Sequence, residues 1–349
     1  MLGASVGYIT DRGTSSRSRR SIDASPAPLL HFVWFVSTPK KALELAAPPP
    51  LRELPPVGRC TILRHLELNP DRQATLWVVG LEARPAIALP LTQMHPRLAV
   101  RPTTRREVLN GSVLARWVDN SSCADASRQF EPRPASSSYQ DLLRLALIYA
   151  TGGTYLDLDE LPIAPLPAGT GGPGWVSDQL GDRVTPGINN AAFDFAPRHA
   201  CLRAALEAAG VTLRTCRFRT TWGMFGPSMF AKLFDPGWPA TPAGRGPPVP
   251  ACSGVARLPA HVFSPVRWQR ARSFYRFSTK FNATWLRDAR VSGTRALHLY
   301  TSNLGVARDA RKAAAFHQRL VQLGICPPGR SSPATSKDLP GHSTYSPDT

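Results

Sequence analysis

The sequence predicts an α/β fold in which a mostly parallel central sheet is flanked by helices. Two apolar runs rich in β-branched and aromatic residues, HFVWFVS from His31 and TLWVVGL from Thr75, have the composition of buried strands. Between them, CTILRHLELN is an amphipathic segment that ends at Asn69-Pro70. Strand, helix and strand in this order are typical of a parallel sheet with crossover helices.

The chain of 349 residues is expected to form one large domain with a tail at each end. Its 42% apolar composition is enough for a sizeable core, and its 35 Pro indicate many interrupted elements and long loops. The ordered domain is expected over residues 30–327. The Ser- and Arg-rich residues 1–29 and the Ser-, Pro- and Thr-rich residues 328–349 are expected to be disordered tails.

The net charge of +18 favours contact with polyanions, acidic membrane surfaces or phosphorylated substrates, and does not choose among them. Arg is scattered along the chain and no nucleic-acid-binding module is recognisable, so no nucleic-acid partner is expected. A peripheral membrane contact through the basic surface stays open. No run of 18 apolar residues is found, so no transmembrane helix is expected.

Six cysteines lie far apart in the sequence without a C-x-x-C pair. This spacing excludes a zinc finger and a thioredoxin-type redox motif. The even number is compatible with disulfides in an oxidising compartment, and equally with free buried thiols. The cysteines therefore leave the redox compartment open.

The clearest helix is expected over Asp141–Ala150, where apolar residues recur at spacings of three and four. Gly152 and Gly153 follow where a left-handed cap is needed. TYLDL, Thr154–Leu158, is then a short strand, and the following LPIAPLP is expected to be an extended loop.

The second half of the chain continues the alternation of strands and helices. GINNAAFDFAP and ALHLYTS are expected to be strands, and AAAFHQRLVQLG is expected to be a closing amphipathic helix. ACLRAALEAAG is expected to be a helix stopped by Gly210, and WGMFGPSMFAKLF a glycine turn followed by a helix. The Pro- and Gly-rich stretch Asp235–Ala251 is expected to be a surface insertion.

Asp157 and Asp159 are the candidate catalytic and metal-binding pair. Two residues separated by one on a strand project to the same side, so Leu158 can face the core while both carboxylates face the cleft at the end of the strand. Ligands bind at that end of open α/β sheets, and paired carboxylates suit Mg²⁺ or Mn²⁺. An Asp-x-Asp triplet on a solvated turn is the alternative, but the preceding buried strand and glycine-stopped helix favour a metal site.

The block QDLLRLALIYATGGTYLDLDELPIAPL resembles the core of the DXD-containing glycosyltransferases of family 32 and the related α-1,4-galactosyltransferases. Their pattern is an Asp and an Arg on a helix, then Gly-Gly, then Tyr-Leu-Asp-x-Asp. Other blocks follow in the family's order, and LVQLGICP is similar to the C-terminal region of lactosylceramide 4-α-galactosyltransferase-like proteins. Those blocks are HFVWF, NPDRQATLWVV, GINNAAFDFAPRHACLRAAL, WGMFGPSMF, HVFSPVRW and ALHLY.

The resemblance covers about residues 31–327 and implies a single GT-A-like domain, the nucleotide-diphospho-sugar transferase fold. Its DXD region would be residues 139–166, and its α-1,4-glycosyltransferase-like C-terminal part residues 210–327. Golgi members of the family carry an N-terminal membrane anchor, and none is expected here because no run of 18 apolar residues is found. The chain is expected to be soluble, or to belong to the Golgi lumen or membrane if its start has been lost.

The resemblance also implies a metal site. Asp157 and Asp159 match the motif in which Mn²⁺ or Mg²⁺ neutralises the diphosphate of a UDP-sugar. His298, in ALHLY, matches a late histidine that completes the coordination of the metal in similar retaining galactosyltransferases. A buried histidine with satisfied hydrogen bonds is the alternative for His298.

Contacts to the nucleotide-sugar are implied in the same way. Asp141 and Arg144 share one helix face and match the pair that the family turns toward the donor, although a surface salt bridge is the alternative. Trp34 matches an aromatic that stacks on the nucleotide base, and a plain core tryptophan is the alternative. Tyr155 belongs to the matched Tyr-Leu-Asp-x-Asp motif, and Asn190 matches the segment that faces donor sugar and acceptor.

The function expected from this resemblance is the transfer of a hexose, galactose or a related sugar, from a UDP-sugar to a glycan or glycolipid acceptor, with retention and an α linkage. No Ser-His-Asp or Cys-His arrangement supplies a nucleophile. Three departures from the family pattern, Gln140, Glu160 and Tyr300, bear on acceptor choice. The alternatives are a non-catalytic basic protein that binds glycans or membrane surfaces, and a glycoside hydrolase.

Overall fold

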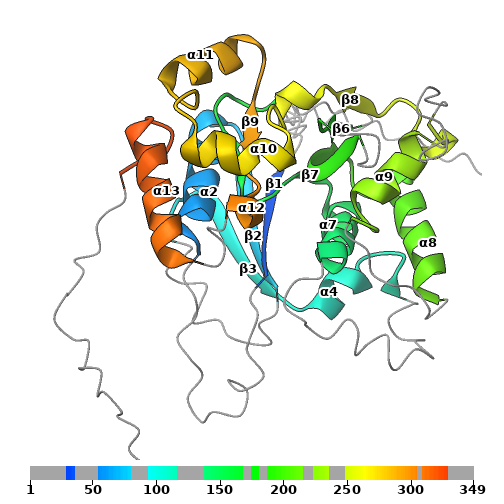
Figure 1. Ribbon diagram of the computed structural model, residues 1–349. Helices are drawn as coiled ribbons and strands as arrows, with labels where there is room; N and C mark the ends of the chain where they lie inside the picture. The colour runs from blue at the N-terminus through cyan, green and yellow to red at the C-terminus, as the bar shows by residue number, and fades with distance from the viewer. Residues whose placement is uncertain are drawn as a thin grey trace, which may run out of the picture.

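The computed structural model describes nine stretches of the chain, shown as ribbons in Figure 1. The predicted tails lie outside them apart from Leu29 and Pro328, as does most of the predicted insertion. The described stretches are residues 29–35, 54–79, 93–115, 137–167, 174–180, 187–214, 223–235, 248–304 and 309–328.

A seven-stranded sheet forms the centre, in the order β3-β2-β1-β4-β7-β6-β8. Of its adjacent pairs, β1-β2, β2-β3, β1-β4 and β6-β8 are parallel, while β7 is antiparallel to both β4 and β6. The predicted mostly parallel sheet is therefore confirmed. The strands are β1 Leu29–Phe35, β2 Gln73–Val79, β3 Leu98–Thr103, β4 Gly153–Leu156, β6 Trp175–Asp178, β7 Ile188–Phe195 and β8 Ala256–Leu258.

Helices cover both faces of this sheet, because alternate side chains of each strand point to opposite sides. On one face, Val33, Tyr155 and Phe193 pack in a core with four helices, which lie to the right of the sheet and below it in Figure 1. On the other face, Phe32 and Leu156 pack against α2, Pro56–Leu68. The four helices are α4 Arg105–Asn110, α7 Ser137–Thr151, α8 Ala200–Arg214 and α9 Pro227–Phe234.

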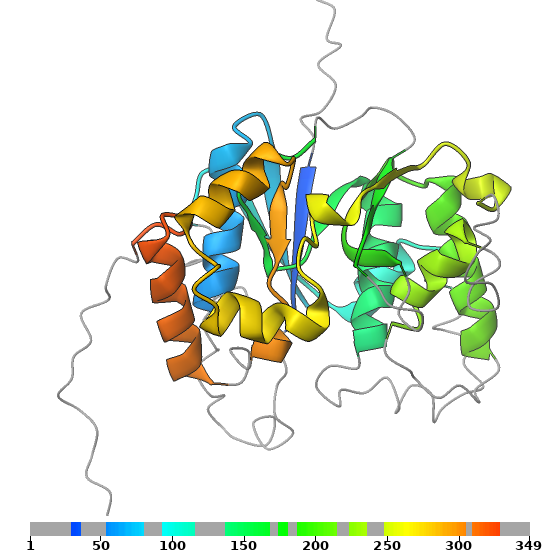
Figure 2. The same cartoon turned by 45° about the horizontal axis from the view of Figure 1, so that its top comes forward.

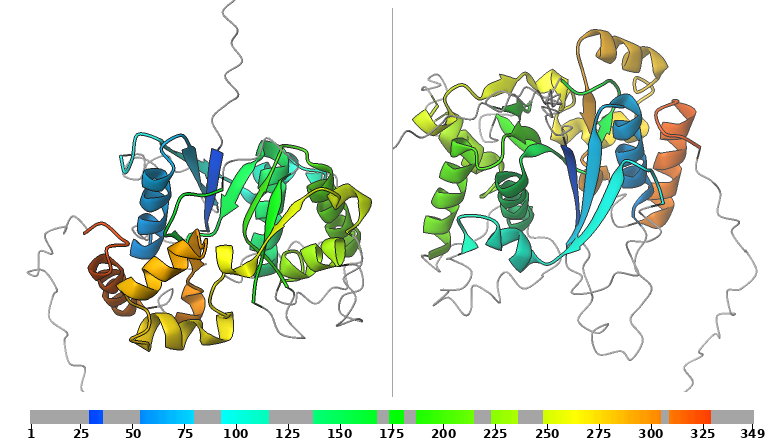
Figure 3. Two further views of the ribbon diagram at one scale, coloured as in Figure 1. Left: turned by 90° about the horizontal axis from the view of Figure 1, so that it is seen from above. Right: turned by 180° about the vertical axis from the view of Figure 1, so that it is seen from behind.

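The C-terminal part of the chain forms a third packed region around a second sheet. This sheet pairs β5, Glu160–Pro162, with β9, Ala296–His298, in antiparallel register. α2 also contributes to this core and contacts the last helix, as both views in Figure 3 show. The surrounding elements are α10 Trp268–Ala271, the π-helical segment η4 Arg272–Phe277, α11 Ala283–Val291, α12 Thr301–Leu304 and α13 Ala310–Gln322. Of the helices in the described stretches, none has the length and apolarity to cross a bilayer.

Four expected element boundaries are wrong. α8 continues through Gly210, which is buried in the helix, because burial of this face outweighs the low helix propensity of glycine. α2 begins at Pro56, ahead of the expected amphipathic segment CTILRHLELN, since Pro fits the first helical turn. The strand predicted over Thr154–Leu158 ends at Leu156, and the predicted loop LPIAPLP contributes Leu161 to strand β5.

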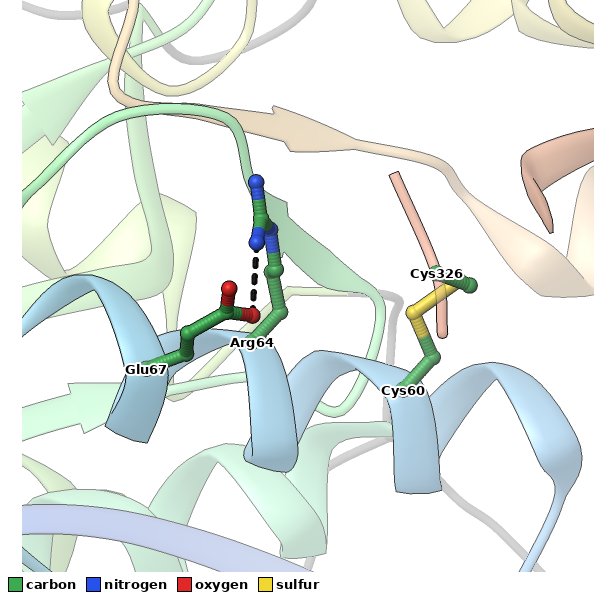
Figure 4. Close-up of a disulfide and its surroundings, with 4 residues drawn as sticks. All are labelled: Cys60, Arg64, Glu67 and Cys326. Carbon is green, nitrogen blue, oxygen red and sulfur yellow. Dashed lines mark ion pairs between the residues drawn. A yellow bond between two sulfur atoms is a disulfide. The ribbon is translucent and has the colours of Figure 1, made fainter. Parts of the chain in front are cut away.

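Two disulfides join distant parts of the described chain, Cys60–Cys326 and Cys201–Cys252. The first connects α2 to the residues that follow α13 across a sequence separation of 266. Figure 4 shows this disulfide on α2, one turn before the Arg64–Glu67 ion pair. The structure thus selects disulfides over free thiols at these four positions; Cys123 and Cys216 lie outside the described residues.

We expect Cys60→Ser to lower the free energy of unfolding by about 2–5 kcal/mol, since a disulfide that closes a long loop removes much of the entropy of the unfolded chain. Thermal and denaturant unfolding of the oxidised protein measure this change. Cys201→Ser, which opens a disulfide with a sequence separation of 51, is the matched control with the smaller loss. Equal stability of wild type and Cys60→Ser would contradict the expectation.

Candidate functional site

Asp157 and Asp159 lie on the turn that connects β4 to β5, not on the strand itself. The expectation that strand alternation aligns the two carboxylates is therefore wrong. The turn is fixed by its backbone instead: the amide of Asp157 donates to the carbonyl of Ala191 at 2.8 Å, and the amide of Glu160 donates to the carbonyl of Asp157 at 3.0 Å. Leu158 packs against the core on the α2 side, as expected.

Asp157 is held by a buried arginine and a buried tyrosine. Arg144 Nη1, from α7, lies 2.9 Å from Oδ1 of Asp157, and the hydroxyl of Tyr155 donates to the same carboxylate at 2.6 Å. Arg144 also lies over the ring of Tyr155 at 4.9 Å. Burial raises the pKa of Asp157, and the charge of Arg144 opposes that rise. These contacts leave the carboxylate 23% exposed and fixed in orientation.

Asp159 is held from the C-terminal part of the chain. Its Oδ2 accepts hydrogen bonds from the amide of Thr301 at 2.8 Å and from the Thr301 hydroxyl at 2.9 Å. Its Oδ1 lies 3.7 Å from Nε2 of His298. The oxygen that Thr301 does not use therefore faces the histidine.

His298 ends β9 and lies directly opposite Glu160 of β5. The ring stacks on Tyr300 at a centroid distance of 3.8 Å, and Tyr300 has a φ of 51°, a left-handed conformation that is uncommon for a residue with a side chain. Burial lowers the pKa of His298, which favours the neutral imidazole. A neutral ring is the form that binds metal.

Asp157, Asp159 and His298 together form a group that could hold a metal ion. Each offers one ligand atom, and the three atoms lie within 4.8 Å of one another. Carboxylate oxygens suit Mg²⁺ and Mn²⁺, and an imidazole nitrogen suits the softer of the two. The three residues that the sequence predicted as metal ligands are brought together from the β4–β5 turn and the end of β9.

Asp141 and Asn190 form a second polar pair beside Arg144. The amide of Asn190, from β7, donates to Oδ1 of Asp141 at 2.7 Å, and Arg144 Nη2 lies 3.7 Å from the same oxygen. Both side chains of the predicted Asp141–Arg144 pair are at most 8% exposed, so it is not a surface salt bridge. Burial raises the pKa of Asp141 to about 6, although Arg144 and the Asn190 hydrogen bond lower it.

Gly226, at the start of α9, closes over this pair. A Cβ at this position would lie 2.6 Å from the carboxyl carbon of Asp141 and would also overlap the amide of Asn190. The Gly226-Pro227 start of the helix therefore lets backbone approach the buried carboxylate, which a larger residue would prevent.

Glu160 is a fully buried carboxyl group behind His298. Its Oε1 lies 3.3 Å from Nδ1 of His298, and neither of its oxygens has a hydrogen-bond partner among the described residues. Burial raises the pKa of Glu160 well above its usual range, and the charges of Asp159 and Asp157 raise it further. Nδ1 of His298 is instead 2.9 Å from the side-chain amide of Asn189.

Trp34 was predicted to contact the nucleotide, but its contacts in the structure lie in the core and not with the other predicted site residues. It is 9% exposed and packs in the core on the α2 side of the sheet with Phe32 and Leu156. Tyr155 and Val33 occupy the opposite face. This packing explains Trp34 as a core residue. Its stacking on the nucleotide base stays a prediction.

Sequence reasoning did not find Thr301 or Asn189 as parts of the site. Thr301 directly follows the strand that carries His298, and Asn189 stands one position before a residue that was predicted. The sequence could have indicated both residues. Polar residues next to a predicted metal ligand are candidates for hydrogen bonds that orient that ligand. The close approach of Gly226 to Asp141 joins positions far apart in the sequence.

We expect Asp141→Asn to raise the free energy of unfolding at pH 7 by about 1–3 kcal/mol, because the buried carboxylate of Asp141 resists ionisation. A raised pKa contributes stability that is present below pH 4 and is lost as the pH rises through about 6. The difference between variant and wild type should therefore vanish toward pH 4. Denaturant unfolding between pH 4 and pH 8 measures it.

Asp309→Asn is the control for this experiment. Hydrogen bonds from Lys312 and Arg311 lower the pKa of Asp309, so the control should lose stability at neutral pH rather than gain it. A loss of stability in Asp141→Asn at pH 7 would contradict the expected sign.

Comparison with known proteins agrees with this geometry. Residues 55–183 match the family model described as the glycosyltransferase sugar-binding region containing DXD motif, and Asp157-Leu158-Asp159 lies inside the match. Lactosylceramide 4-alpha-galactosyltransferase of Mus musculus is 24% identical over 276 residues, covering 77% of this chain and 69% of the relative. The protein of the same name from Homo sapiens is 23% identical over 275 residues, covering 76% and 69%.

Among solved structures, the galactosyltransferase LgtC in complex with donor and acceptor sugar analogs is similar with a TM-score of 0.42 and 13% identity. The match covers 86% of this chain and 97% of that one. Residues 55–183 are thus similar to the sugar-binding region of DXD-containing glycosyltransferases, and most of the chain is similar to 4-alpha-galactosyltransferases.

Proposed function

We propose that the protein transfers a hexose, galactose or a related sugar, from a UDP-sugar to a glycan or glycolipid acceptor, with a divalent cation and with retention that gives an α linkage. The observation that carries this proposal is the group of three ligand atoms from Asp157, Asp159 and His298 within 4.8 Å of one another. The curated relatives are named as 4-alpha-galactosyltransferases, which supports the choice of sugar and linkage. We assign this activity to the domain predicted over residues 30–327.

The excess of carboxyl groups at the site supports the binding of a cation there. Four carboxyl groups lie at or directly behind the turn, those of Asp141, Asp157, Asp159 and Glu160, and Arg144 is the one cation that pairs with them among the described residues. Burial raises the pKa of three of the four, so the site is unfavourable for negative charge without further compensation. Mn²⁺ or Mg²⁺ would supply that compensation and would act as a Lewis acid on the diphosphate of the donor.

Arg144 and its neighbours would position the donor. The guanidinium of Arg144 holds Asp157 at 2.9 Å, and its Nε, which is buried, has no hydrogen-bond partner among the described residues. Tyr155 orients the same carboxylate, and the Asp141–Asn190 pair lies next to it as hydrogen-bonding groups for sugar hydroxyls. Catalysis would depend on this positioning and on electrostatic stabilisation of the departing diphosphate.

His298 can bind a cation through Nε2 only if its proton is on Nδ1. Oδ1 of Asn189 accepts from the amide of Ala191 at 3.0 Å, so the NH₂ group of Asn189 faces His298, and Nδ1 accepts from it. That arrangement leaves the proton of the neutral ring on Nε2. If Nε2 bound a cation, the ring proton would be on Nδ1, and Oε1 of Glu160, which lies 3.3 Å from Nδ1, would be its acceptor. The side-chain amide of Asn189 would then still donate a hydrogen bond to Oγ of Ser264, which lies 3.3 Å away.

We expect Asp157→Asn and Asp159→Asn each to abolish Mn²⁺-dependent binding of UDP, because each removes a charged ligand of the proposed site. Isothermal titration of UDP with and without Mn²⁺ measures the binding, and hydrolysis of UDP-galactose without acceptor measures turnover. Asp178→Asn, which changes an aspartate that pairs with Arg257 away from this group, should behave like the wild type.

Other outcomes of the same measurements would reject the proposed function. Equal UDP binding with and without Mn²⁺ would reject the metal site. Wild-type protein that turns over no UDP-sugar, yet binds anionic glycans or membranes, would be a basic binding protein instead. Cleavage of a glycan without metal would indicate a glycoside hydrolase.

We expect Glu160→Leu to weaken Mn²⁺ binding about 10-fold to 100-fold, since outer partners of ligating histidines have effects of this size. Glu160→Gln, which keeps an oxygen acceptor near Nδ1, should lose much less. Nitrogen NMR of the His298 ring with Mg²⁺ reports the tautomer directly: the proton should be on Nδ1 in wild type and not in Glu160→Leu. Removing an unpaired buried carboxyl should leave the fold at least as stable, so unfolding of the variant would not explain the loss. Wild-type Mn²⁺ affinity in Glu160→Leu would contradict this role.

A further inference from the structure

A cavity of about 530 Å³ opens beside the second sheet. Its volume lies within the range of about 300–1,000 Å³ that is usual for small-molecule sites. Leu180 lines it from the end of β6, and the segment that contains α10, η4 and α11 lines the rest. None of the residues that the donor site uses is among its lining residues.

Three cations line this cavity: Arg267, Arg270 and Lys280. All three are exposed, and no described acidic side chain forms an ion pair with them. Residues 257–295 contain eight Arg and one Lys against a single acid, Asp288, which pairs with Arg287. The cavity is therefore a concentration of positive charge without an internal counter-charge, which attracts an anionic ligand.

Aromatic rings share the lining with these cations. Phe274 and Trp285 are half-buried, and they meet edge to face at a centroid distance of 5.0 Å. The rings give the cavity apolar surface next to the cations, and Ser278 adds a hydroxyl to the lining. Apolar faces of sugar rings pack on aromatic side chains, while carboxylate or sulfate groups pair with Arg and Lys.

The cavity lies next to the proposed metal site. α10 and η4 both contact α12, which begins with Thr301, the residue that holds Asp159. In Figure 2 the yellow α10–η4 segment runs across the front of the molecule, beside the orange α12. On the other side, the lining residue Pro265 follows Ser264, which receives a hydrogen bond from Asn189. The elements that line the cavity thus contact, or directly precede in sequence, the groups that hold Asp159 and His298.

We propose that this cavity binds the acidic group of a saccharide acceptor, so that the enzyme prefers an acceptor that carries a carboxylate or a sulfate ester close to the hydroxyl that receives the sugar. This inference rests on the proposed function for its place in the reaction, since it names the class of acceptor. A bilayer surface fits the cavity less well, because a flat surface requires cations on a projecting face and these cations line a hollow.

The test uses the full chain and three acceptors that share one core: lactose, sialyllactose and a sulfated lactose. Isothermal titration with Mn²⁺ and UDP present measures their affinities. We expect the two acidic sugars to bind at least about tenfold more tightly than lactose, and Arg267→Ala, Arg270→Ala and Lys280→Ala each to remove about tenfold of that gain. Arg287→Ala, an exposed arginine of α11 outside the lining, is the matched control and should keep the preference.

Hydrolysis of UDP-galactose without acceptor separates this proposal from the proposed function. The three variants should hydrolyse the donor like the wild type, because none of these residues contacts the donor site. If wild type turns over no UDP-sugar but binds acidic sugars through these cations, the proposed function fails and the anion site stands.

Equal affinity for lactose and the acidic sugars would overturn the proposed anion site, and so would an acidic preference that survives in all three variants. Binding to phosphatidylserine vesicles through these cations, without binding of the soluble acidic sugars, would also overturn it in favour of a lipid surface.

Discussion

The buried ion pair between Arg144 and Asp157 is the contact on which the site depends. Arg144 comes from α7 and also donates to the carbonyl of Asn190 at 3.0 Å, so one guanidinium joins a helix, the turn after β4, and β7. Burial alone would lower the pKa of Arg144, but the charges of Asp157, Tyr155 and Asp141 raise it overall. A buried charge of this kind costs free energy unless it is paired. The pairing of Arg144 therefore fixes Asp157 and the relative position of the three elements.

The same site holds more negative charge than this pairing can offset. Glu160 has no hydrogen-bond partner among the described residues, and burial raises its pKa well above the usual range. Such arrangements lower stability, and chains retain them where function requires the charge. The left-handed backbone of Tyr300, stacked on His298, lies in the same region. The buried carboxyl group and the uncommon backbone conformation thus lie beside the proposed metal ligands, as expected for groups prearranged for a ligand.

Local patterns predicted the α7–β4 unit and its carboxylates because the signals there are short in sequence. The helical spacing before Gly152, the positive φ of Gly152 and Gly153, and the following strand are all properties of neighbouring residues. The turn geometry of Asp157 and Asp159 was missed because β5 pairs with a strand more than 130 residues later. The hydrogen bonds from Thr301 to Asp159 were missed for the same reason, because the two residues are 142 positions apart in the sequence.

These long-range contacts make the proposed metal site a product of the whole domain. Thr301 holds Asp159 across a sequence separation of 142, and Asn189 meets His298 across 109. The C-terminal region must therefore dock before the third ligand can join the other two. The Cys60–Cys326 disulfide fastens α2 to the end of that region, and α2 in turn packs against β5, which follows the acidic turn directly. A covalent bond far from the ligands thus favours the arrangement in which β9 presents His298 to Asp159.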